Sequence, residues 1–321
     1  MTIAVIGAGA FGASLAIVQA RAGRDVVLWA RDPGEMPTSR QIPRLPGVRL
    51  PDNIRVTGRI VDVAVADVWL LAVPMQALSG VLPSLPASDA ICVACCKGID
   101  LVRNIGPHDV LTEAGRRAAV LTGPSFAADI ARDRPTALTL AAGDLETAMR
   151  LQAALSTPTL RLYASDDPRG AALGGALKNV VAIACGLAIG AGFGDSARAA
   201  LMTRGFVEMQ RFVAALGGRA DTLVGLAGLG DLALTCHSEL SRNFCYGQAL
   251  GQGAGTMRAT DPTTTTVEGC ATARAAAALA LRHGLDMPIT HTVAQLVAGD
   301  MTITQAAASL MARPLKEERG C

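Results

Sequence analysis

One stretch near the start of the chain decides the fold: Gly7-Ala8-Gly9-Ala10-Phe11-Gly12. It directly follows the apolar run Thr2–Ile6 and precedes residues 13–22, which have the composition of a helix. A G-x-G-x-x-G pattern between a strand and a helix lets the backbone approach a pyrophosphate, whose charge the helix N-terminal amides carry. The chain has 34 glycines, so a purely structural turn is the alternative. The flanking strand and helix favour a dinucleotide-binding, Rossmann-type start.

Further apolar runs bounded by turns continue this theme. They span residues 26–29, 68–73, 90–94, 118–121, 137–141 and 160–163. Continuous apolar runs suit strands of a parallel sheet that is covered on both faces. After residue 163 the chain becomes rich in Ala, Leu and Gly at helical spacing. We therefore predict an α/β protein with a Rossmann-type NAD(P)-binding domain over residues 1–166 and a mostly α-helical domain over residues 167–321.

Two segments carry weaker predictions. Residues 43–51 form a proline-rich connection, read either as a plain loop or as a surface segment near the ligand. The polar tail from Lys316 to Cys321 is expected to fray.

Composition excludes several classes of function. The 29 Lys and Arg against 27 Asp and Glu give a formal charge of +2, which offers no broad field for nucleic acid, and 3 % aromatic residues provide few stacking platforms. Residues 180–194 are interrupted by glycines and fall short of the ~20 apolar residues of a membrane span. The 8 scattered cysteines and the uncharged N-terminal start indicate a reducing cytoplasm.

The end of the second predicted strand bears on the choice of cofactor. This position often carries an acid for the ribose of NAD(H), and here the chain reads Trp29-Ala30-Arg31-Asp32. Arg31 would pair with a 2′-phosphate, which favours NADP(H), while Asp32 would serve NAD(H) if the turn were shifted. The remaining alternative is that Arg31 is a solvated loop charge.

A lone lysine stands in an otherwise small and apolar segment, Leu173-Gly174-Gly175-Ala176-Leu177-Lys178-Asn179, at the expected domain junction. Burial would lower the pKa of such a lysine, and its neutral form would accept a hydroxyl proton while its ammonium form returned one. The alternative is a lysine that reaches from an apolar helix into solvent.

Other polar groups stand where ligands bind in such folds. Lys97 follows one predicted strand and the turn 123–127 follows the next, so both lie at carboxyl ends of the sheet. Later, Asp231 stands in a glycine-rich turn, and its carboxylate suits a cation. It is followed by Ser241-Arg242-Asn243, whose Arg-Asn pair suits a phosphate. Each segment taken singly is also consistent with a turn or a helix cap.

Taken together, these segments resemble the bacterial NAD(P)-dependent glycerol-3-phosphate dehydrogenase family from Ile3 to about Leu310. The resemblance rests on residues 7–12, 45–51, 97–98, 123–126, 174–179, 228–231, 241–243 and 267–269. The family usually has a hydroxyl residue at the position of Ala10 and commonly Thr at those of Ala13 and Cys96. These departures put one pyrophosphate contact in doubt.

The resemblance implies reversible reduction of dihydroxyacetone phosphate to sn-glycerol 3-phosphate, the backbone of glycerophospholipids. It makes Lys178 the catalytic proton donor and acceptor in a substrate-binding and catalytic second domain. The implied substrate-binding residues are Lys97, Gly123, Ser125, Lys178, Asp231, Ser241, Arg242 and Asn243. The implied cofactor-binding residues are Gly7, Gly9, Ala10, Phe11, Gly12, Arg31, Lys97, Ala127, Arg242 and Glu268.

Elementary chemistry agrees with these implied roles. Lys97 beside Lys178 would further lower a lysine pKa, and Arg242 offers a planar fork for the phosphate. Asp231 would either hold the ammonium or bind a substrate hydroxyl. Whether the chain forms a homodimer stays open.

Cysteine and histidine residues carry two further signals. Cys92 and Cys95 have redox or zinc spacing, but they lie in a predicted buried strand without a second ligand pair, so no metal is expected. Of the four histidines, only His237 stands near the predicted site in sequence.

Two other functions are alternatives. A dehydrogenase of hydroxy acids or sugar acids would need a group that binds the substrate carboxylate at the place where a phosphate contact is expected here. A nucleotide-sensing protein without catalysis is disfavoured by the two lysines and Asp231.

Overall fold

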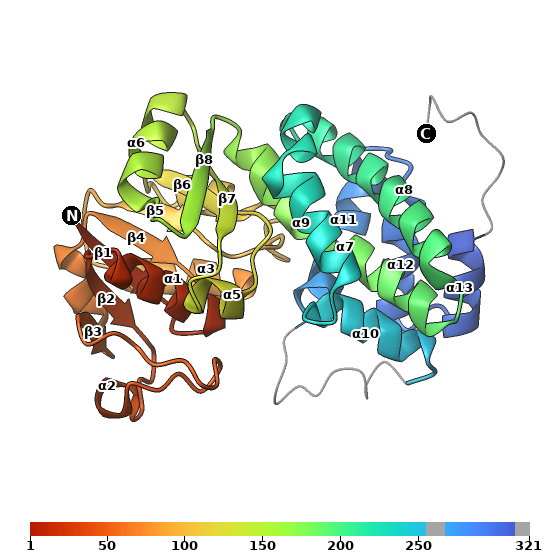
Figure 1. Ribbon diagram of the computed structural model, residues 1–321. Helices are drawn as coiled ribbons and strands as arrows, with labels where there is room; N and C mark the ends of the chain where they lie inside the picture. The colour runs from red at the N-terminus through yellow and green to blue at the C-terminus, as the bar shows by residue number, and fades with distance from the viewer. Residues whose placement is uncertain (255–266, 312–321) are drawn as a thin grey trace. The chain divides into compact units, whose positions relative to one another are not determined.

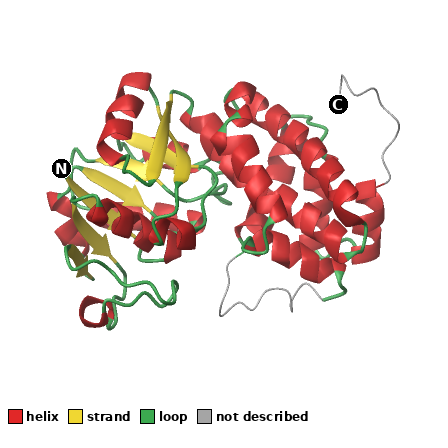
Figure 2. Cartoon of the chain, in the orientation of Figure 1, coloured by secondary structure: helices red, strands yellow, loops and turns green. Residues whose placement is uncertain are grey.

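The computed structural model describes residues 1–254 and 267–311, and the chain divides into two compact units. The first unit comprises Met1–Lys97 and Ile105–Pro168, and the second comprises Gly98–Asn104 and the chain from Arg169 onward. Within the described residues, strands occur only in the first unit (Figures 1 and 2). The predicted α/β fold with a helical second part is therefore confirmed. The tail from Lys316 lies outside the described residues.

The first unit is built on one sheet of eight strands in the order β3-β2-β1-β4-β5-β6-β7-β8. The strands are β1 Thr2–Ile6, β2 Asp25–Trp29, β3 Ile54–Thr57, β4 Val68–Leu71, β5 Ile91–Ala94, β6 Ala118–Thr122, β7 Thr136–Ala142 and β8 Leu160–Ser165. All neighbouring pairs are parallel except β6 with β7. The expectation of parallel strands throughout is wrong at that pair, and β3 was not predicted.

Helices cover this sheet. They are α1 Ala10–Arg21, α2 Met36–Ser39, α3 Met75–Val81, α4 Pro107–Glu113, α5 Ala127–Ala131 and α6 Leu145–Leu155, with 3₁₀ turns η1 Ile60–Val65 and η2 Leu82–Ser84. Helix α1 packs with α5, and α6 packs on β7 and β8 (Figure 1). The α6 N-terminus is capped by Asp144, whose carboxylate accepts from the Thr147 amide at 2.7 Å. The proline-rich residues 43–51 are irregular.

The turn between β1 and α1 explains two of its glycines. Gly7 has φ +112°, and a Cβ there would lie 2.6 Å from the carbonyl oxygen of Ala72. A Cβ at Gly12 would collide with the carbonyl oxygen of Gly7. Only residues without a side chain allow this tight passage from strand to helix, and α1 consequently begins at Ala10, three residues before the predicted helix.

Apart from the irregular segment Gly98–Asn104, the described residues of the second unit form helices and their connections. They are α7 Pro168–Gly190, α8 Gly194–Ala215, α9 Asp231–His237, α10 Arg242–Gly251, α11 Glu268–Arg282, α12 Pro288–Ala298 and α13 Ile303–Met311, with a 3₁₀ turn η3 Ala220–Val224 and a π-helical turn η4 Leu226–Gly230. Helix α12 packs with α8, α11 and α13, and α9 packs with α8 and α10.

Helix α7 is the core of this unit. Among the described residues it is the one helix long and apolar enough to cross a membrane, but 94 % of its most apolar window is buried, as in the central helix of a soluble protein. It packs backbone to backbone with α10. A Cβ at Gly186 would collide with the carbonyl oxygen of Phe244, and a Cβ at Gly247 with that of Ile183. Glycines on both helices therefore permit the close crossing.

Helix α12 is capped by another helix. Glu208 on α8 is 2 % exposed, and its carboxylate accepts from the amides of Ile289 and Thr290 at 2.7 and 3.0 Å. The Thr290 hydroxyl donates to the same carboxylate at 2.9 Å. First-turn amides have no acceptor within their own helix, so this buried charge satisfies them.

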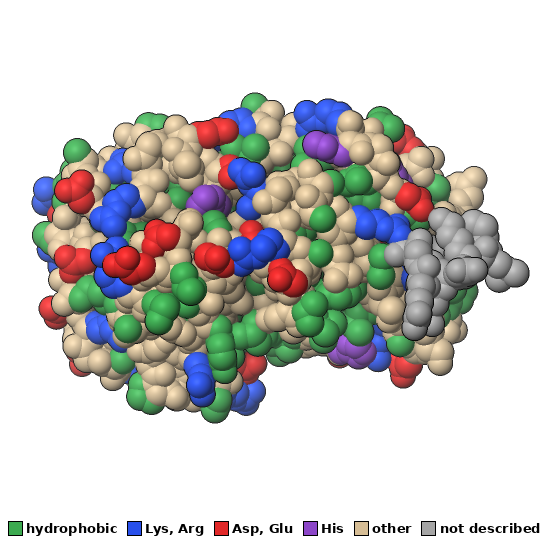
Figure 3. Space-filling view, turned by 90° about the horizontal axis from the view of Figure 1, so that it is seen from above, with side chains coloured by type: hydrophobic (Ala, Val, Ile, Leu, Met, Phe, Trp, Pro, Cys, Tyr) green, Lys and Arg blue, Asp and Glu red, His purple; other side chains and the backbone are tan. Residues whose placement is uncertain are grey.

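Charge is evenly mixed on the surface shown in Figure 3. Lys and Arg side chains stand among Asp and Glu side chains, and neither sign covers a continuous area of this face. This arrangement agrees with the nearly neutral formal charge of +2.

Candidate active site

The carboxyl ends of β5 and β6 bring three predicted residues together in the first unit. The Lys97 ammonium donates to the carbonyl oxygen of Gly123 at 3.0 Å, and the Ser125 hydroxyl donates to the same oxygen at 3.3 Å. Gly123 has φ +139°, and a Cβ there would lie 3.1 Å from Leu138 Cδ2. The glycine therefore lets the chain leave β6 close to β7 and present its carbonyl group to both side chains.

In the second unit, Lys178 on α7 is 7 % exposed, so it does not reach into solvent. Its Nζ donates to Thr235 Oγ1 at 2.7 Å and lies 3.0 Å from Asp231 Oδ1. The Thr235 hydroxyl donates to the backbone oxygen of Asp231 at 2.6 Å. Burial disfavours the ammonium form, whereas the neighbouring carboxylate favours it. The lysine thus has fixed partners for its proton-bearing nitrogen.

Local sequence explains where Asp231 stands. It is the first residue of α9 and 1 % exposed, at the point where the π-helical turn η4 passes directly into α9. The preceding turn requires glycine, because a Cβ at Gly228 would collide with backbone atoms of Leu223. Gly174 on α7 is equally constrained, since a Cβ would lie 2.8 Å from the carbonyl oxygen of Ala227. Helix α7 can therefore lie directly against this turn.

The predicted Ser241-Arg242-Asn243 group forms the start of α10. Ser241 is the N-cap residue, and its Oγ accepts from the Phe244 amide at 3.2 Å. Arg242 is exposed at the first helical position. Asn243 Nδ2 donates to Asn179 Oδ1 at 2.9 Å, which joins α10 to the residue after Lys178.

The residues predicted to bind the cofactor begin at the turn after β1. Gly7 and Gly12 are required by packing, whereas a Cβ at Gly9, the N-cap residue of α1, would meet no atom within 4 Å. Packing therefore does not explain the glycine at position 9, whereas the close approach of a pyrophosphate would. Ala10 and Phe11 form the first turn of α1, so the turn fits a dinucleotide.

The remaining cofactor candidates occupy several elements. Arg31 and Asp32 are exposed after β2, and the Asp32 carboxylate accepts from the Gly34 amide at 3.0 Å within its own turn. Ala127 and Glu268 are the first residues of α5 and α11. Ala127 belongs to the first unit and Glu268 to the second.

Two residues in contact with the predicted site had no predicted role: Thr235, and Asn179, which stands beside Lys178 in the predicted segment 173–179. Thr235 receives the Lys178 hydrogen bond, and Asn179 accepts from Asn243. A signal for Thr235 existed, because a residue four positions after Asp231 lies on the same face of a helix. Asn179 adjoins Lys178 in sequence, but only the tertiary structure shows its partner.

The cysteine and histidine signals lead elsewhere. Burial raises the pKa of the Cys92 thiol to about 11 and that of Cys95 well above its ordinary value, so both stay protonated at neutral pH. Among the described residues, no group of three His, Cys, Asp or Glu side chains is arranged to hold a metal. His237 is the exposed last residue of α9, and its Nδ1 lies 3.0 Å from the carbonyl oxygen of Ala233.

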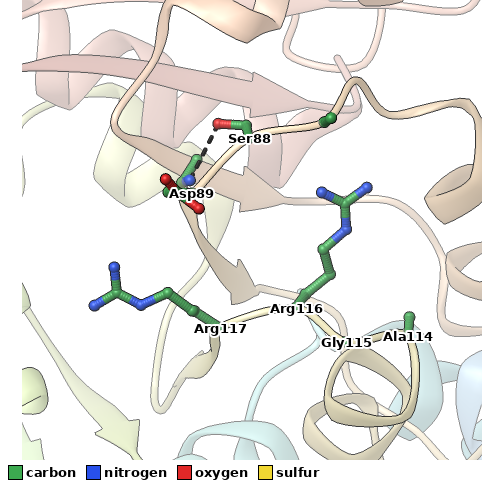
Figure 4. A pocket seen from close by; sticks show the side chains of 8 residues that line it. Ser88, Asp89, Ala114, Gly115, Arg116 and Arg117 are labelled. Atoms are coloured by element: carbon green, nitrogen blue, oxygen red, sulfur yellow. Dashed lines mark hydrogen bonds between the residues drawn. The ribbon is translucent and has the colours of Figure 1, made fainter.

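A surface pocket of about 670 Å³ lies at the opposite edge of the sheet. Residues 87–90 and 114–117 line it, before the amino ends of β5 and β6. Figure 4 shows the Arg116 and Arg117 side chains pointing away from each other. The Arg116 guanidinium stacks 5.5 Å from the Trp69 ring centroid. The two cations do not converge on one ligand, and the predicted residues Lys97, Gly123 and Ser125 of the first unit follow the carboxyl ends of β5 and β6 instead.

A Rossmann-type sheet with a glycine-rich turn, followed by a helical unit with a buried lysine–carboxylate pair, defines the class of NAD(P)-dependent dehydrogenases. Residues 2–148 match the family described as NAD-dependent glycerol-3-phosphate dehydrogenase N-terminus, and residues 167–308 match NAD-dependent glycerol-3-phosphate dehydrogenase C-terminus. The chain belongs to this family and is an NAD(P)-dependent glycerol-3-phosphate dehydrogenase, as the sequence resemblance implied.

Individual relatives agree with this assignment. The chain is 55 % identical over 320 residues to glycerol-3-phosphate dehydrogenase (NAD(P)+) of Cereibacter sphaeroides, covering 98 % of this chain and 100 % of the relative. It is also 55 % identical over 326 residues to the enzyme of the same name from Ruegeria sp., covering 99 % and 100 %. The crystal structure of glycerol-3-phosphate dehydrogenase from Coxiella burnetii superposes with a TM-score of 0.91 at 35 % identity, covering 97 % of this chain and 99 % of that one.

Proposed function

We propose that the enzyme reduces dihydroxyacetone phosphate to sn-glycerol 3-phosphate, reversibly, with Lys178 as the general acid and base. The observation that carries this proposal is the buried Lys178 ammonium, which is held by Asp231 Oδ1 at 3.0 Å and Thr235 Oγ1 at 2.7 Å. A proton donor must point at the atom that receives the proton, and these two contacts restrict where the Lys178 Nζ atom can lie.

The proposed chemistry needs one proton at one oxygen. When bound, the nicotinamide supplies the hydride in reduction and accepts it in oxidation. Lys178 donates its proton to the oxygen of the carbonyl group as that oxygen becomes an alkoxide, and neutral Lys178 takes the proton back from the hydroxyl in the reverse direction. Asp231 stabilises the ammonium before the transfer and limits how readily the proton leaves.

The substrate phosphate is assigned to the start of α10. Arg242 is exposed there and presents a planar guanidinium suited to bidentate phosphate contacts. The first-turn amides of a helix also point at such an anion. Ser241 and Asn243 flank Arg242, and Lys97, Gly123 and Ser125 complete the proposed substrate contacts.

The cofactor is assigned to the turn after β1, with NADP(H) favoured and NAD(H) accepted. Gly7, Gly9, Ala10, Phe11 and Gly12 would line the pyrophosphate. Arg31 is exposed after β2 and supplies a cation for the 2′-phosphate, while the Asp32 carboxylate is engaged with the Gly34 amide. We assign the further cofactor contacts to Lys97, Ala127, Arg242 and Glu268.

These assignments give the two proposed domains different roles. Residues 1–166 form the proposed cofactor domain, and residues 167–321 form the proposed substrate and catalytic domain. We further propose a cytoplasmic enzyme that supplies the backbone for glycerophospholipid synthesis. We also predict a homodimer, and a measurement of the molecular mass in solution tests this prediction.

An assay of dihydroxyacetone phosphate reduction with NADPH and with NADH tests the proposed function. Replacing Arg242 with Ala should reduce kcat/KM for dihydroxyacetone phosphate more than for unphosphorylated dihydroxyacetone, because only the former has the anion. Arg242→Lys should recover part of the loss, since the charge returns without the planar fork.

The matched control is Arg282→Ala, which removes an exposed arginine at the end of α11. Equal losses on both substrates in Arg242→Ala would contradict the phosphate assignment. Turnover of a hydroxy acid with none of dihydroxyacetone phosphate would contradict the proposed reaction.

A further inference from the structure

Helix α11 begins without a capping side chain of its own. Its N-cap residue is Val267, which has no side-chain acceptor, and the first amides of a helix have no intrahelical partner. The amide of Gly269 instead donates to Asn243 Oδ1 at 3.0 Å. The capping acceptor for α11 is therefore supplied by α10, from the segment proposed to bind the substrate phosphate.

The same Asn243 amide also reaches the central helix. Its Nδ2 donates to Asn179 Oδ1 at 2.9 Å, and Asn179 on α7 is 3 % exposed and adjoins Lys178. An asparagine side chain has a donor end and an acceptor end, and here both ends are used. Asn243 thus connects three helices: α10, which carries it, α7 through Asn179, and α11 through Gly269.

Packing makes this connection tight. A Cβ at Gly269 would lie 2.7 Å from Asn243 Oδ1, 2.8 Å from Ile183 Cδ1 and 2.9 Å from the carbonyl oxygen of Asn179. The first turn of α11 therefore rests directly on one turn of α7, where only a glycine fits. A displacement of this turn would break the hydrogen bond and open a gap at the same time.

We propose that Asn243 is a positioning residue that holds the first turn of α11, and with it Glu268, against α7. This inference rests on the proposed role of Glu268 as a cofactor contact. Glu268 directly precedes Gly269, so fixing the Gly269 amide limits the backbone freedom of Glu268. Asn243 then contributes to cofactor affinity before any substrate is present, in addition to its proposed contact with the substrate.

The test compares two variants of Asn243 in the full-length enzyme. Asn243→Ala removes the acceptor, so hydrogen exchange at the start of α11 should accelerate and NADPH should bind about threefold to tenfold more weakly without substrate, as expected for one lost hydrogen bond. Asn243→Asp keeps the acceptor, so both properties should recover. The added negative charge should nevertheless raise KM for dihydroxyacetone phosphate, which separates the two roles.

The matched control is Tyr246→Phe. Tyr246 is buried one turn further along α10, with its hydroxyl group beside the Cys270 thiol of α11, so this change also removes a polar group between α10 and α11 but leaves Gly269 capped. Exchange at Gly269 and NADPH affinity should be unchanged. Gly269→Ala, which forces the turn off α7, should reproduce the Asn243→Ala loss of affinity.

Two results would overturn the inference: unchanged exchange at the start of α11 in Asn243→Ala, or unchanged NADPH affinity in that variant while Glu268→Ala weakens it. The Glu268→Ala variant tests separately whether Glu268 contacts the cofactor. If Glu268→Ala binds NADPH normally, the cofactor role proposed for Glu268 is wrong, and the exchange measurement still decides whether Asn243 caps α11.

Discussion

Replacing Thr235 with Val should damage catalysis without removing the lysine. Valine has nearly the same shape as threonine but has no hydroxyl group, so Lys178 Nζ would lose its 2.7 Å acceptor and the Asp231 carbonyl its 2.6 Å donor. Hydrogen bonds to charged groups contribute about 1.5–3 kcal/mol. If the transition state requires the lysine in this position, kcat should fall about tenfold to a hundredfold.

The assay is steady-state reduction of dihydroxyacetone phosphate with a parallel measurement of NADPH affinity, which should not change. Thr203→Val is the matched control, because the exposed Thr203 hydroxyl donates to the Ala199 carbonyl oxygen at 2.9 Å in the same i to i−4 manner, without touching the lysine. A kcat for Thr235→Val equal to that of Thr203→Val would refute the reasoning that this hydroxyl positions Lys178.

Two further predictions concern the cofactor and stability. Arg31→Ala should weaken NADPH more than NADH, because the guanidinium gains its charge-assisted contact only from the 2′-phosphate; equal loss in titrations with both cofactors would count against this. Glu208→Ala should lower the free energy of unfolding by about 3–5 kcal/mol, since two buried amides lose their acceptor. Urea denaturation measures this change, and the exposed Glu239→Ala should have little effect; similar midpoints for both variants would contradict the capping argument.

Local sequence was sufficient to predict the strand–turn–helix start, because Gly7 and Gly12 serve contacts within a few residues or with the adjacent strand. It was insufficient for β3, residues 54–57, where only two of the four side chains are buried. The sequence also did not indicate that β7 runs antiparallel to β6. Both β6 and β7 are continuous buried runs, and such a run has no mark of strand direction.

The candidate site likewise has one part that the sequence predicts and another part that only the packing of the helices determines. The meeting of Lys97, Gly123 and Ser125 follows from a general property of parallel sheets, whose carboxyl ends share one edge. The Asn243–Gly269 hydrogen bond has no such rule behind it, because it depends on three helices approaching at one glycine. Sequence patterns indicate which residue types stand at a site, whereas their partners depend on packing.

The central claim is that Lys178 transfers the proton, and the rate of a single turnover tests it most directly. With NADPH and dihydroxyacetone phosphate both saturating, Lys178→Ala should slow the reduction by about 10²–10⁴-fold, while NADPH affinity stays unchanged. Lys178→Arg should be similarly slow, because the guanidinium keeps the charge beside Asp231 but does not release its proton. A single-turnover rate close to that of the unmodified enzyme in either variant would contradict the account.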